Sequence, residues 1–285
     1  MTSTIDHPHV RLVQSYLAVV GQGDVTTAAA LFAPDVRYHV PGHNRLAGDG
    51  LGPDAVMGYF GALSRLSAGT YAVTETVDWL VGGDRVLLVA REHVEVAGRR
   101  LDWTRLILFR VADGKMAEIW LFEDDQAALD AVIGGDGATT GTESFSGPPA
   151  MFGALDDPKV KAVMDYQAAM ARGDLDAARP VFDRAVSYRV PGHGPLGGAY
   201  DGPDAVMGYL WRLMEVTGGS YAISRMDWLA SDDRVGLATR NHAERGGRWL
   251  SWDEVILFRF EDGRKREIDL FSGDQDAVDA LLANR

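Results

Sequence analysis

The chain has 285 residues, of which 46% are hydrophobic and 24% charged, a composition typical of a folded, water-soluble protein with about two domains. Its formal net charge of −13 disfavours nucleic acid and acidic membrane surfaces as partners. It has no cysteine, so disulfides and thiolate chemistry are excluded, and its polar N-terminus and lack of a long apolar run predict neither a signal peptide nor a membrane span. We therefore expect a cytoplasmic protein.

The first part of the chain predicts helices separated by glycine and proline. Apolar residues recur at helical spacing over 8–20, and Gly21 ends this pattern. Asp24 suits the N-cap of a second, shorter helix, and Pro41 ends a short strand. The elements expected here are helices over 8–20, 24–32 and 53–66 and a strand over 36–40.

Four strand-like runs follow, and a short helix then closes the segment. Glycine-containing turns separate the runs, which predicts hairpins. The elements expected here are strands over 70–81, 85–96, 99–111 and 115–122 and a helix over 124–132. Helices followed by an antiparallel sheet predict an α+β architecture, with a ligand cavity between the helices and the sheet.

The same series of elements occurs twice along the chain. Residues 52–59 recur letter for letter at 202–209, and Val-Pro-Gly-His at 40–43 recurs at 190–193. We predict two copies of one domain, arranged as a pseudo-dimer through the outer faces of their sheets. The expected boundaries are 1–134 for copy one, 135–157 for a linker rich in Gly, Ser, Thr and Pro, and 158–285 for copy two.

Short motifs in both copies carry a family resemblance. Val13-Gln14-Ser15-Tyr16, with the Gly-Asp at 23–24, resembles the opening of ketosteroid isomerases. The His-Val-Pro-Gly at 39–42 and the Asp-Gln-Ala at 125–127 resemble SnoaL-like polyketide cyclases still more closely. On these motifs the chain is identified as a tandem member of the SnoaL-like, nuclear transport factor 2-like (ketosteroid isomerase-like) superfamily. This resemblance implies two cone-shaped domains, each with three helices packed on a strongly curved antiparallel sheet.

The isomerase machinery carries over only in part. Tyr16 and Tyr166 match the tyrosine that donates to the oxyanion in ketosteroid isomerases. The position of the catalytic base falls on Val40, and that of the oxyanion aspartate on Ile107, neither of which exchanges a proton. Steroid-type isomerisation by that machinery is therefore not expected. The carboxylate that tandem epoxide hydrolases use at the same strand end is missing too.

The resemblance and the alternation of strand residues select candidate site residues in copy one. The expected catalytic residues are Tyr16, His39, His43, Glu92 and Arg105, and the expected substrate-binding residues are Tyr38, Trp103, Ile107 and Phe109. Histidine titrates near neutral pH and suits acid–base work. A buried arginine needs a partner, so Arg105 either binds an anionic ligand or pairs with Glu92.

Several alternatives stay open at this level. A β-bulge would decide whether Tyr38 or His39 faces the cavity, and whether Glu92 or His93 does. The same choice exists in copy two between Asn241 and His242. His43 is either a site residue or a turn residue of the surface loop.

Copy two has a different polar lining, which indicates two unequal pockets. Its expected substrate-binding residues are Tyr166, Tyr188, His193, Asn241, Trp252 and Glu254. Glu254 replaces Arg105, and Arg189 replaces His39. Copy one is the expected active copy, although burial would raise the pKa of Glu254 and make it an alternative general acid or base.

The predicted function is that of a cofactor-free acid/base enzyme, a cyclase, isomerase or dehydratase, acting on a hydrophobic polyketide-like small molecule in secondary metabolism. One alternative is an epoxide hydrolase or epoxide-opening cyclase, and another is a non-catalytic binding protein for an apolar metabolite. No metal-ligand spacing, phosphate-binding loop or dinucleotide motif is present, so no cofactor and no metal are expected. We expect the whole chain to be monomeric, with an intramolecular pseudo-dimer.

Overall fold

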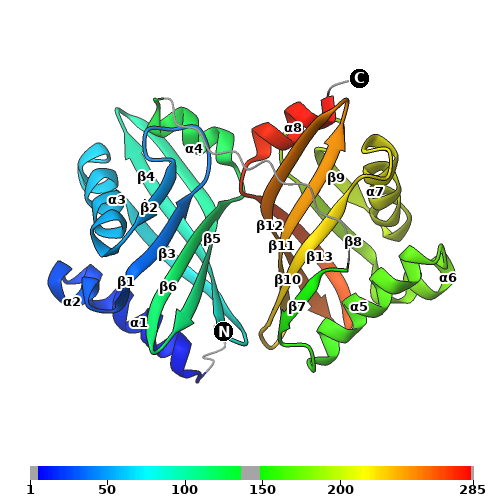
Figure 1. Ribbon diagram of the computed structural model, residues 1–285, viewed down its shortest axis with the longest axis horizontal. Coiled ribbons are helices and arrows are strands. Elements are labelled where there is room, and N and C mark those ends of the chain that lie inside the picture. Colours follow the sequence, from blue (N-terminus) through cyan, green and yellow to red (C-terminus); the bar gives the residue numbers. More distant parts are fainter. Residues whose placement is uncertain (1–5, 136–147, 284–285) are drawn as a thin grey trace. The chain divides into compact units, whose positions relative to one another are not determined.

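The computed structural model describes residues 6–135 and 148–283 of the chain, which folds as two compact units (Figure 1). Unit 1 comprises Met1–Thr139 and unit 2 comprises Thr140–Arg285. Both have the predicted α+β architecture. The pairing of the two copies through their outer sheet faces stays a prediction. Within the described residues, no helix combines the length and apolarity needed to cross a bilayer.

Within its described residues, unit 1 has four helices and a six-stranded sheet, with two helices before the first strand, one between the second and third strands and one after the last. Its helices are α1 (Pro8–Gly21), α2 (Val25–Ala29), α3 (Pro53–Leu66) and α4 (Gln126–Ile133). Its strands are β1 (Phe32–Val40), β2 (Gly48–Leu51), β3 (Ala72–Gly82), β4 (Arg85–Val96), β5 (Arg99–Ala112) and β6 (Lys115–Glu123). The predicted helix over 53–66 and the predicted strand over 85–96 have the bounds observed for α3 and β4.

Unit 2 repeats this series with one added strand. Its helices are α5 (Pro158–Ala171), α6 (Leu175–Ala178), the 3-10 helix η1 (Arg179–Val181), α7 (Pro203–Val216) and α8 (Gln275–Ala283). Its strands are β7 (Ala150–Gly153), β8 (Phe182–Val190), β9 (Gly198–Asp201), β10 (Ala222–Ala230), β11 (Arg234–Arg245), β12 (Arg248–Glu261) and β13 (Arg264–Ser272). Part of the predicted linker lies outside the described residues. Its described end includes β7, so that end belongs to the sheet of unit 2.

Capping residues explain where several helices begin. Asp24 caps α2, because its carboxylate accepts a hydrogen bond of 3.0 Å from the amide of Thr27. Asp174 caps α6 in the same way through the amide of Ala177. Proline occupies the first turn of α1, α3, α5 and α7, where its missing N–H costs no hydrogen bond.

The sheets are mixed rather than wholly antiparallel, which corrects the expectation. In unit 1 the strand order is β2-β1-β6-β5-β4-β3, and β1 runs parallel to β6 while the other neighbours are antiparallel. Unit 2 has the corresponding order β9-β8-β13-β12-β11-β10, with β8 parallel to β13 and β7 parallel to β10. The parallel pair arises because β1 and β6 are joined through the rest of the unit and not by a hairpin.

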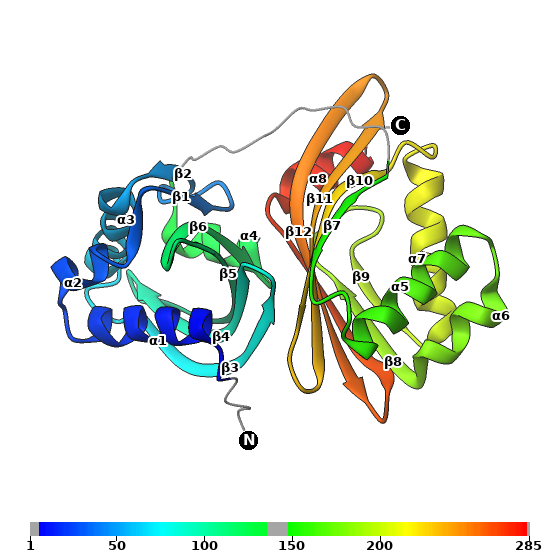
Figure 2. The same ribbon diagram turned by 60° about the horizontal axis from the view of Figure 1, so that its bottom comes forward.

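The helices of each unit cover one face of its curved sheet, as Figure 2 shows for α1 and α5. In unit 1, Val10, Val13 and Tyr16 of α1 lie on one side of the helix and are buried against sheet residues such as Phe109. In unit 2 the corresponding core is formed by α5, α7 and the sheet. The space between the helices and the sheet is therefore the interior of each unit.

Candidate functional site

A pocket opens between the helices and the sheet of unit 2. It holds about 540 Å³ of space free of protein atoms, its open mouth included. Most of its lining is apolar. The polar and aromatic side chains that line it include Tyr188, Tyr209, Tyr221, Trp252, Glu254 and Asp279.

Glu254 is the most deeply placed acidic group of this pocket's interior strands, and no cationic side chain of the described residues lines the pocket beside it. It lies on β12 and is 7% exposed. The indole N–H of Trp252 donates a hydrogen bond of 3.2 Å to its Oε2 atom. Burial raises the pKa of Glu254 to about 7, and the hydrogen bond from Trp252 opposes this only in part. Among the described lining residues none is Lys, Arg or His. The carboxyl group can therefore change protonation state close to neutral pH.

Three tyrosines line the pocket together with Glu254. Burial, followed by the nearby charge of Glu254, raises the pKa of Tyr209 and Tyr221 well above the usual value, so both hydroxyls stay protonated. Tyr221 donates a hydrogen bond of 3.0 Å to the side-chain oxygen of Asn241. The rings of Tyr188 and Tyr209 meet edge to face, with centroids 4.9 Å apart. The pocket thus combines the carboxyl group of Glu254, which has a raised pKa, with neutral hydroxyl donors.

The corresponding region of unit 1 holds a buried ion cluster. The Arg105 guanidinium lies 2.9 Å from carboxylate oxygens of both Glu92 and Glu123, and all three side chains are at most 2% exposed. Arg105 also donates a hydrogen bond of 3.3 Å to the hydroxyl of Tyr59, and the indole of Trp103 donates one of 2.7 Å to Glu123. Burial raises the pKa of Glu92 to about 7 although Arg105 opposes the shift. Of the two roles predicted for Arg105, the structure shows the pairing with Glu92.

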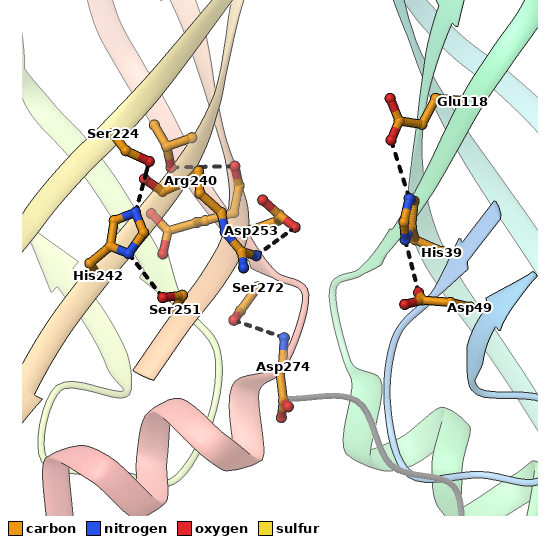
Figure 3. A network of polar contacts seen from close by, with 12 residues as sticks. His39, Asp49, Glu118, Ser224, Arg240, His242, Ser251, Asp253, Ser272 and Asp274 are labelled. Atoms are coloured by element: carbon orange, nitrogen blue, oxygen red, sulfur yellow. Dashed lines mark hydrogen bonds and ion pairs between the residues drawn. The ribbon is translucent and has the colours of Figure 1, made fainter. Parts of the chain in front are cut away.

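The histidines predicted on the strands point away from the interiors. Tyr38 is buried in the core of unit 1, so His39 lies on the other face of β1, where it contacts Asp49 at 2.8 Å and Glu118 at 3.4 Å (Figure 3). Burial lowers the pKa of His39, but the hydrogen bonds to these two carboxylates outweigh it and raise the pKa overall. This placement removes His39 from the pocket-facing candidates.

The choice between Glu92 and His93 is decided in the same way, with the histidine on the face of the sheet away from the interior. Glu92 faces the interior, and His93 contacts Asp102 at 2.9 Å on the other face of β4. In unit 2, Asn241 faces inward, while His242 is hydrogen-bonded to Ser224 and Ser251 (Figure 3). In both copies the strand that carries these residues, β4 or β11, pairs with the next strand without a bulge, so successive side chains alternate between the two faces of the sheet.

His43 and His193 belong to a turn that is anchored through its backbone. The carboxylate of Asp130 accepts a hydrogen bond of 2.8 Å from the amide of His43. In unit 2, Asp279 accepts from the amides of His193 at 2.6 Å and Gly194 at 2.9 Å. Because Asp279 also lines the pocket, this anchored turn lies at its edge. The repeated Pro-Gly-His motif therefore has a structural role in both copies.

The remaining predicted residues are core side chains. Trp103, Ile107, Phe109 and Tyr16 are packed in the core of unit 1, and burial raises the pKa of Tyr16. Tyr166 lies in the core of unit 2, where the side-chain nitrogen of Lys265 lies 4.0 Å from the centroid of its ring. Trp252, Tyr188 and Glu254 are the predicted residues that the pocket brings together.

Sequence reasoning missed several residues at these sites. They are Tyr59, Tyr71 and Glu123 in unit 1 and Tyr209, Tyr221 and Ser272 in unit 2. The tyrosines had a usable signal, since each occurs at the same place in both copies. Glu123 had none, because an acidic run before a helix is usually explained by the helix dipole. Within the described part of the chain, no three acidic or histidine side chains converge to hold a metal ion.

Comparison with known proteins finds relatives that each cover a little under half of this chain. An uncharacterized protein of Mycobacterium tuberculosis (strain H37Rv) is 35% identical over 127 residues, which are 44% of this chain and 96% of that protein. A solved protein of unknown function with a cystatin-like fold from Xanthomonas campestris is 30% identical, covering 44% of this chain and 98% of its own, with a TM-score of 0.42. Bal32a, from a soil-derived mobile gene cassette, is 31% identical, covering 44% of this chain and 95% of its own, with a TM-score of 0.41.

The model of the SnoaL-like domain matches the chain twice, over residues 13–119 and 163–268. These two matches cover most of both units and confirm the family predicted from the sequence motifs. The chain therefore belongs to the SnoaL-like domain family and contains that domain in tandem.

Proposed function

We propose that unit 2 is a cofactor-free acid/base site for a hydrophobic, polyketide-like small molecule, on which it performs a cyclisation, isomerisation or dehydration. The observation that supports this most is Glu254, a buried carboxyl group in a mostly apolar pocket whose pKa is raised to about 7. A general acid or base is most effective when its pKa lies near the working pH.

The proposed mechanism uses Glu254 as the group that moves the proton. Its carboxylate accepts a proton from the ligand, and the resulting carboxylic acid returns a proton at another position. The Trp252 indole N–H stabilises the ionised form through its hydrogen bond to Oε2. Tyr209, which stays protonated, is available to donate to an oxygen of the ligand. The apolar lining excludes water and strengthens these interactions.

Unit 2 is a better candidate than unit 1, although the sequence favours copy one. In unit 1 the ionisable groups at the corresponding positions are occupied with one another, since Arg105 pairs with both Glu92 and Glu123. The pKa of Glu92 is also raised to about 7, but a proton taken up there weakens a buried ion pair, whereas no cationic side chain of the described residues lines the pocket beside Glu254.

The epoxide-opening alternative needs a second acidic group that is free to act beside Glu254. Asp279 lines the same pocket, but its carboxylate already accepts from two backbone amides and from the side chain of Gln275 at 2.7 Å. This arrangement favours a structural role for Asp279. We therefore prefer acid/base catalysis by Glu254 alone to epoxide opening by two acidic groups.

The test begins with mass spectrometry of small molecules retained by the purified protein. With the substrate identified, turnover is measured for Glu254→Gln, His43→Ala and the exposed control Glu215→Gln. We expect Glu254→Gln to lower kcat by about 10²- to 10⁴-fold, and the other two variants to keep the wild-type rate. Full activity in Glu254→Gln with loss in His43→Ala would move the site to unit 1. A ligand that is retained but never converted would identify a non-catalytic binding protein.

A further inference from the structure

Both units contain the same group of four aromatic side chains in the interior, and we call each group an aromatic cage. The cage of unit 1 consists of Tyr38, Tyr59, Tyr71 and Trp103. The repeat gives the cage of unit 2 as Tyr188, Tyr209, Tyr221 and Trp252, all of which line the pocket. The cages share their aromatic residues but differ in the charged group that they enclose.

The cage of unit 1 encloses a cation that belongs to the chain itself. The carbon of the Arg105 guanidinium lies 5.3 Å from the centroid of the Trp103 ring, a cation–π contact. The guanidinium also donates to the hydroxyl of Tyr59 and pairs with Glu92 and Glu123. Unit 1 therefore shows a planar organic cation held in this cage by the ring of Trp103 and the hydroxyl of Tyr59.

The cage of unit 2 has a negative group where unit 1 has the cation. Glu254 occupies the position of Arg105, and Asn241 and Ser272 occupy those of Glu92 and Glu123. Both carboxylates that balance Arg105 are therefore replaced by neutral side chains, and one carboxyl group faces an open pocket instead. Among the described lining residues no cationic side chain balances Glu254.

We propose that the pocket of unit 2 binds a small organic cation, a molecule with an ammonium or guanidinium group that pairs with Glu254 and lies against the rings of Trp252 and Tyr209. This inference rests on the proposed function in one respect, that the pocket of unit 2 is the ligand site. The rings attract a cation through their electron-rich faces, and Glu254 supplies the opposite charge. The ligand cation would thus neutralise the carboxylate of Glu254 inside the pocket.

The protonation state of Glu254 should make the affinity for a cation depend on pH. The titratable side chains that line the pocket are Tyr188, Tyr209, Tyr221, Glu254 and Asp279. Burial raises the pKa of the three tyrosines above the usual range, and the pKa of Glu254 to about 7. A bound cation favours the carboxylate of Glu254, so affinity for a cation should rise as the pH passes from 6 to 8. Affinity for an uncharged ligand of the same shape should not.

The experiment compares choline with its uncharged carbon analogue 3,3-dimethylbutan-1-ol by isothermal titration calorimetry of the full chain at pH 6 and pH 8. At pH 8 we expect choline to bind at least ~10-fold more tightly, because a desolvated cation–π contact and an ion pair together exceed the ~1.4 kcal/mol that a tenfold change requires. Glu254→Gln should abolish this preference, and Trp252→Phe should reduce choline affinity severalfold with Glu254 still present. Glu215→Gln removes an exposed carboxylate outside the pocket and should change neither affinity.

A third probe, neutral 2-naphthol, separates this inference from the proposed function. Binding of 2-naphthol with no preference for choline over its analogue would overturn the cation proposal and leave the apolar acid/base site standing. If none of the three probes binds, both proposals fail. The thermal unfolding midpoint of each variant, measured beside the wild type, shows that a lost preference is not a lost fold.

Discussion

Arg105 on β5 lies directly opposite Glu123 on β6, and Glu254 on β12 lies directly opposite Ser272 on β13. The two copies thus keep the same strand register while the pair of side chains changes from an ion pair to a carboxyl group and a hydroxyl group. The strand register is the same at this point in both units. The difference therefore lies in three side chains, since Asn241, Glu254 and Ser272 replace Glu92, Arg105 and Glu123. These replacements explain why an ion cluster fills the interior of unit 1 while a pocket opens in unit 2.

Glu254→Gln should change how stability depends on pH. The folded state raises the pKa of Glu254 from 4.5 to about 7, so it holds the proton more tightly than the unfolded chain does. The wild type should therefore lose stability as the pH rises from 4.5 to 7, by up to about 3 kcal/mol, and Gln, which does not titrate, should not. Urea unfolding at pH 5 and pH 8 measures this difference. Parallel pH dependences of the two proteins would contradict it, and Glu215→Gln should follow the wild type.

Arg105→Met should destabilise unit 1 strongly. It leaves Glu92 and Glu123 buried without their cation, which typically costs about 3–5 kcal/mol. The triple variant Glu92→Gln/Arg105→Met/Glu123→Gln removes all three charges and should be markedly more stable than Arg105→Met alone. Chemical unfolding followed by tryptophan fluorescence compares the two. Equal stabilities would show that the cluster is not held together by its charges.

Asp279→Ala should loosen the turn at the pocket of unit 2. Its carboxylate holds the amides of His193 and Gly194, and each lost hydrogen bond to a charged acceptor is worth about 1.5–3 kcal/mol. Hydrogen exchange of these two amides should become faster, and ligand binding should weaken. Asp130→Ala makes the same change in unit 1, where it should release the amide of His43 without affecting the ligand. Unchanged exchange in Asp279→Ala would contradict the anchoring role.

Lys265→Met should stabilise unit 2. The Lys265 side chain is completely buried, its nitrogen has no hydrogen-bond partner among the described residues, and burial lowers its pKa well below 10.5. Unit 1 has Met116 at the corresponding position. Removing this amine, which has no hydrogen-bond partner among the described residues, should raise the free energy of unfolding of unit 2 by about 1–3 kcal/mol.

The gain from Lys265→Met should also depend on pH in a defined direction. A depressed pKa means that the unfolded chain binds the proton better, so the wild type loses stability as the pH falls below 10.5. The stabilisation should therefore be larger at pH 7 than at pH 10, as measured by the thermal unfolding midpoint. Lys161→Met, on an exposed lysine, should change the midpoint little at either pH. A gain that is the same at both values would argue that Lys265 is not neutral in the fold.

The sequence predicts the fold well because its signals are periodic and repeated. Two local signals predict the elements: the spacing of apolar residues in α1 and α3, and the turns between the long strands. Both signals occur in each copy of the repeat. β2 and β7 escape prediction because each has four residues with no alternation, and they form only through pairing with a neighbouring strand.

The site was predicted less completely for a different reason. The family resemblance with strand alternation favours Glu92 and Arg105 on one face and leaves His93 as the alternative to Glu92, but it does not tell whether a buried pair leaves room for a ligand. That depends on Glu123, which joins the cluster only because β6 extends through it to face Arg105. The position of Tyr59 on α3 depends likewise on how the helix packs over the sheet.

The short strand β7 fixes where unit 2 must begin if it is ever produced alone. Residues 150–153 pair with the edge of β10, and Phe152 stacks on Arg225 with its ring centroid 4.6 Å from the guanidinium carbon. Gly153 is required there, since a Cβ atom at this position would lie 2.1 Å from the carbonyl oxygen of Trp228. A recombinant fragment starting at Pro158 would leave this length of β10 without its partner, and a bare strand edge recruits other chains. A fragment starting before Ala150 should stay in solution at concentrations where the shorter one precipitates.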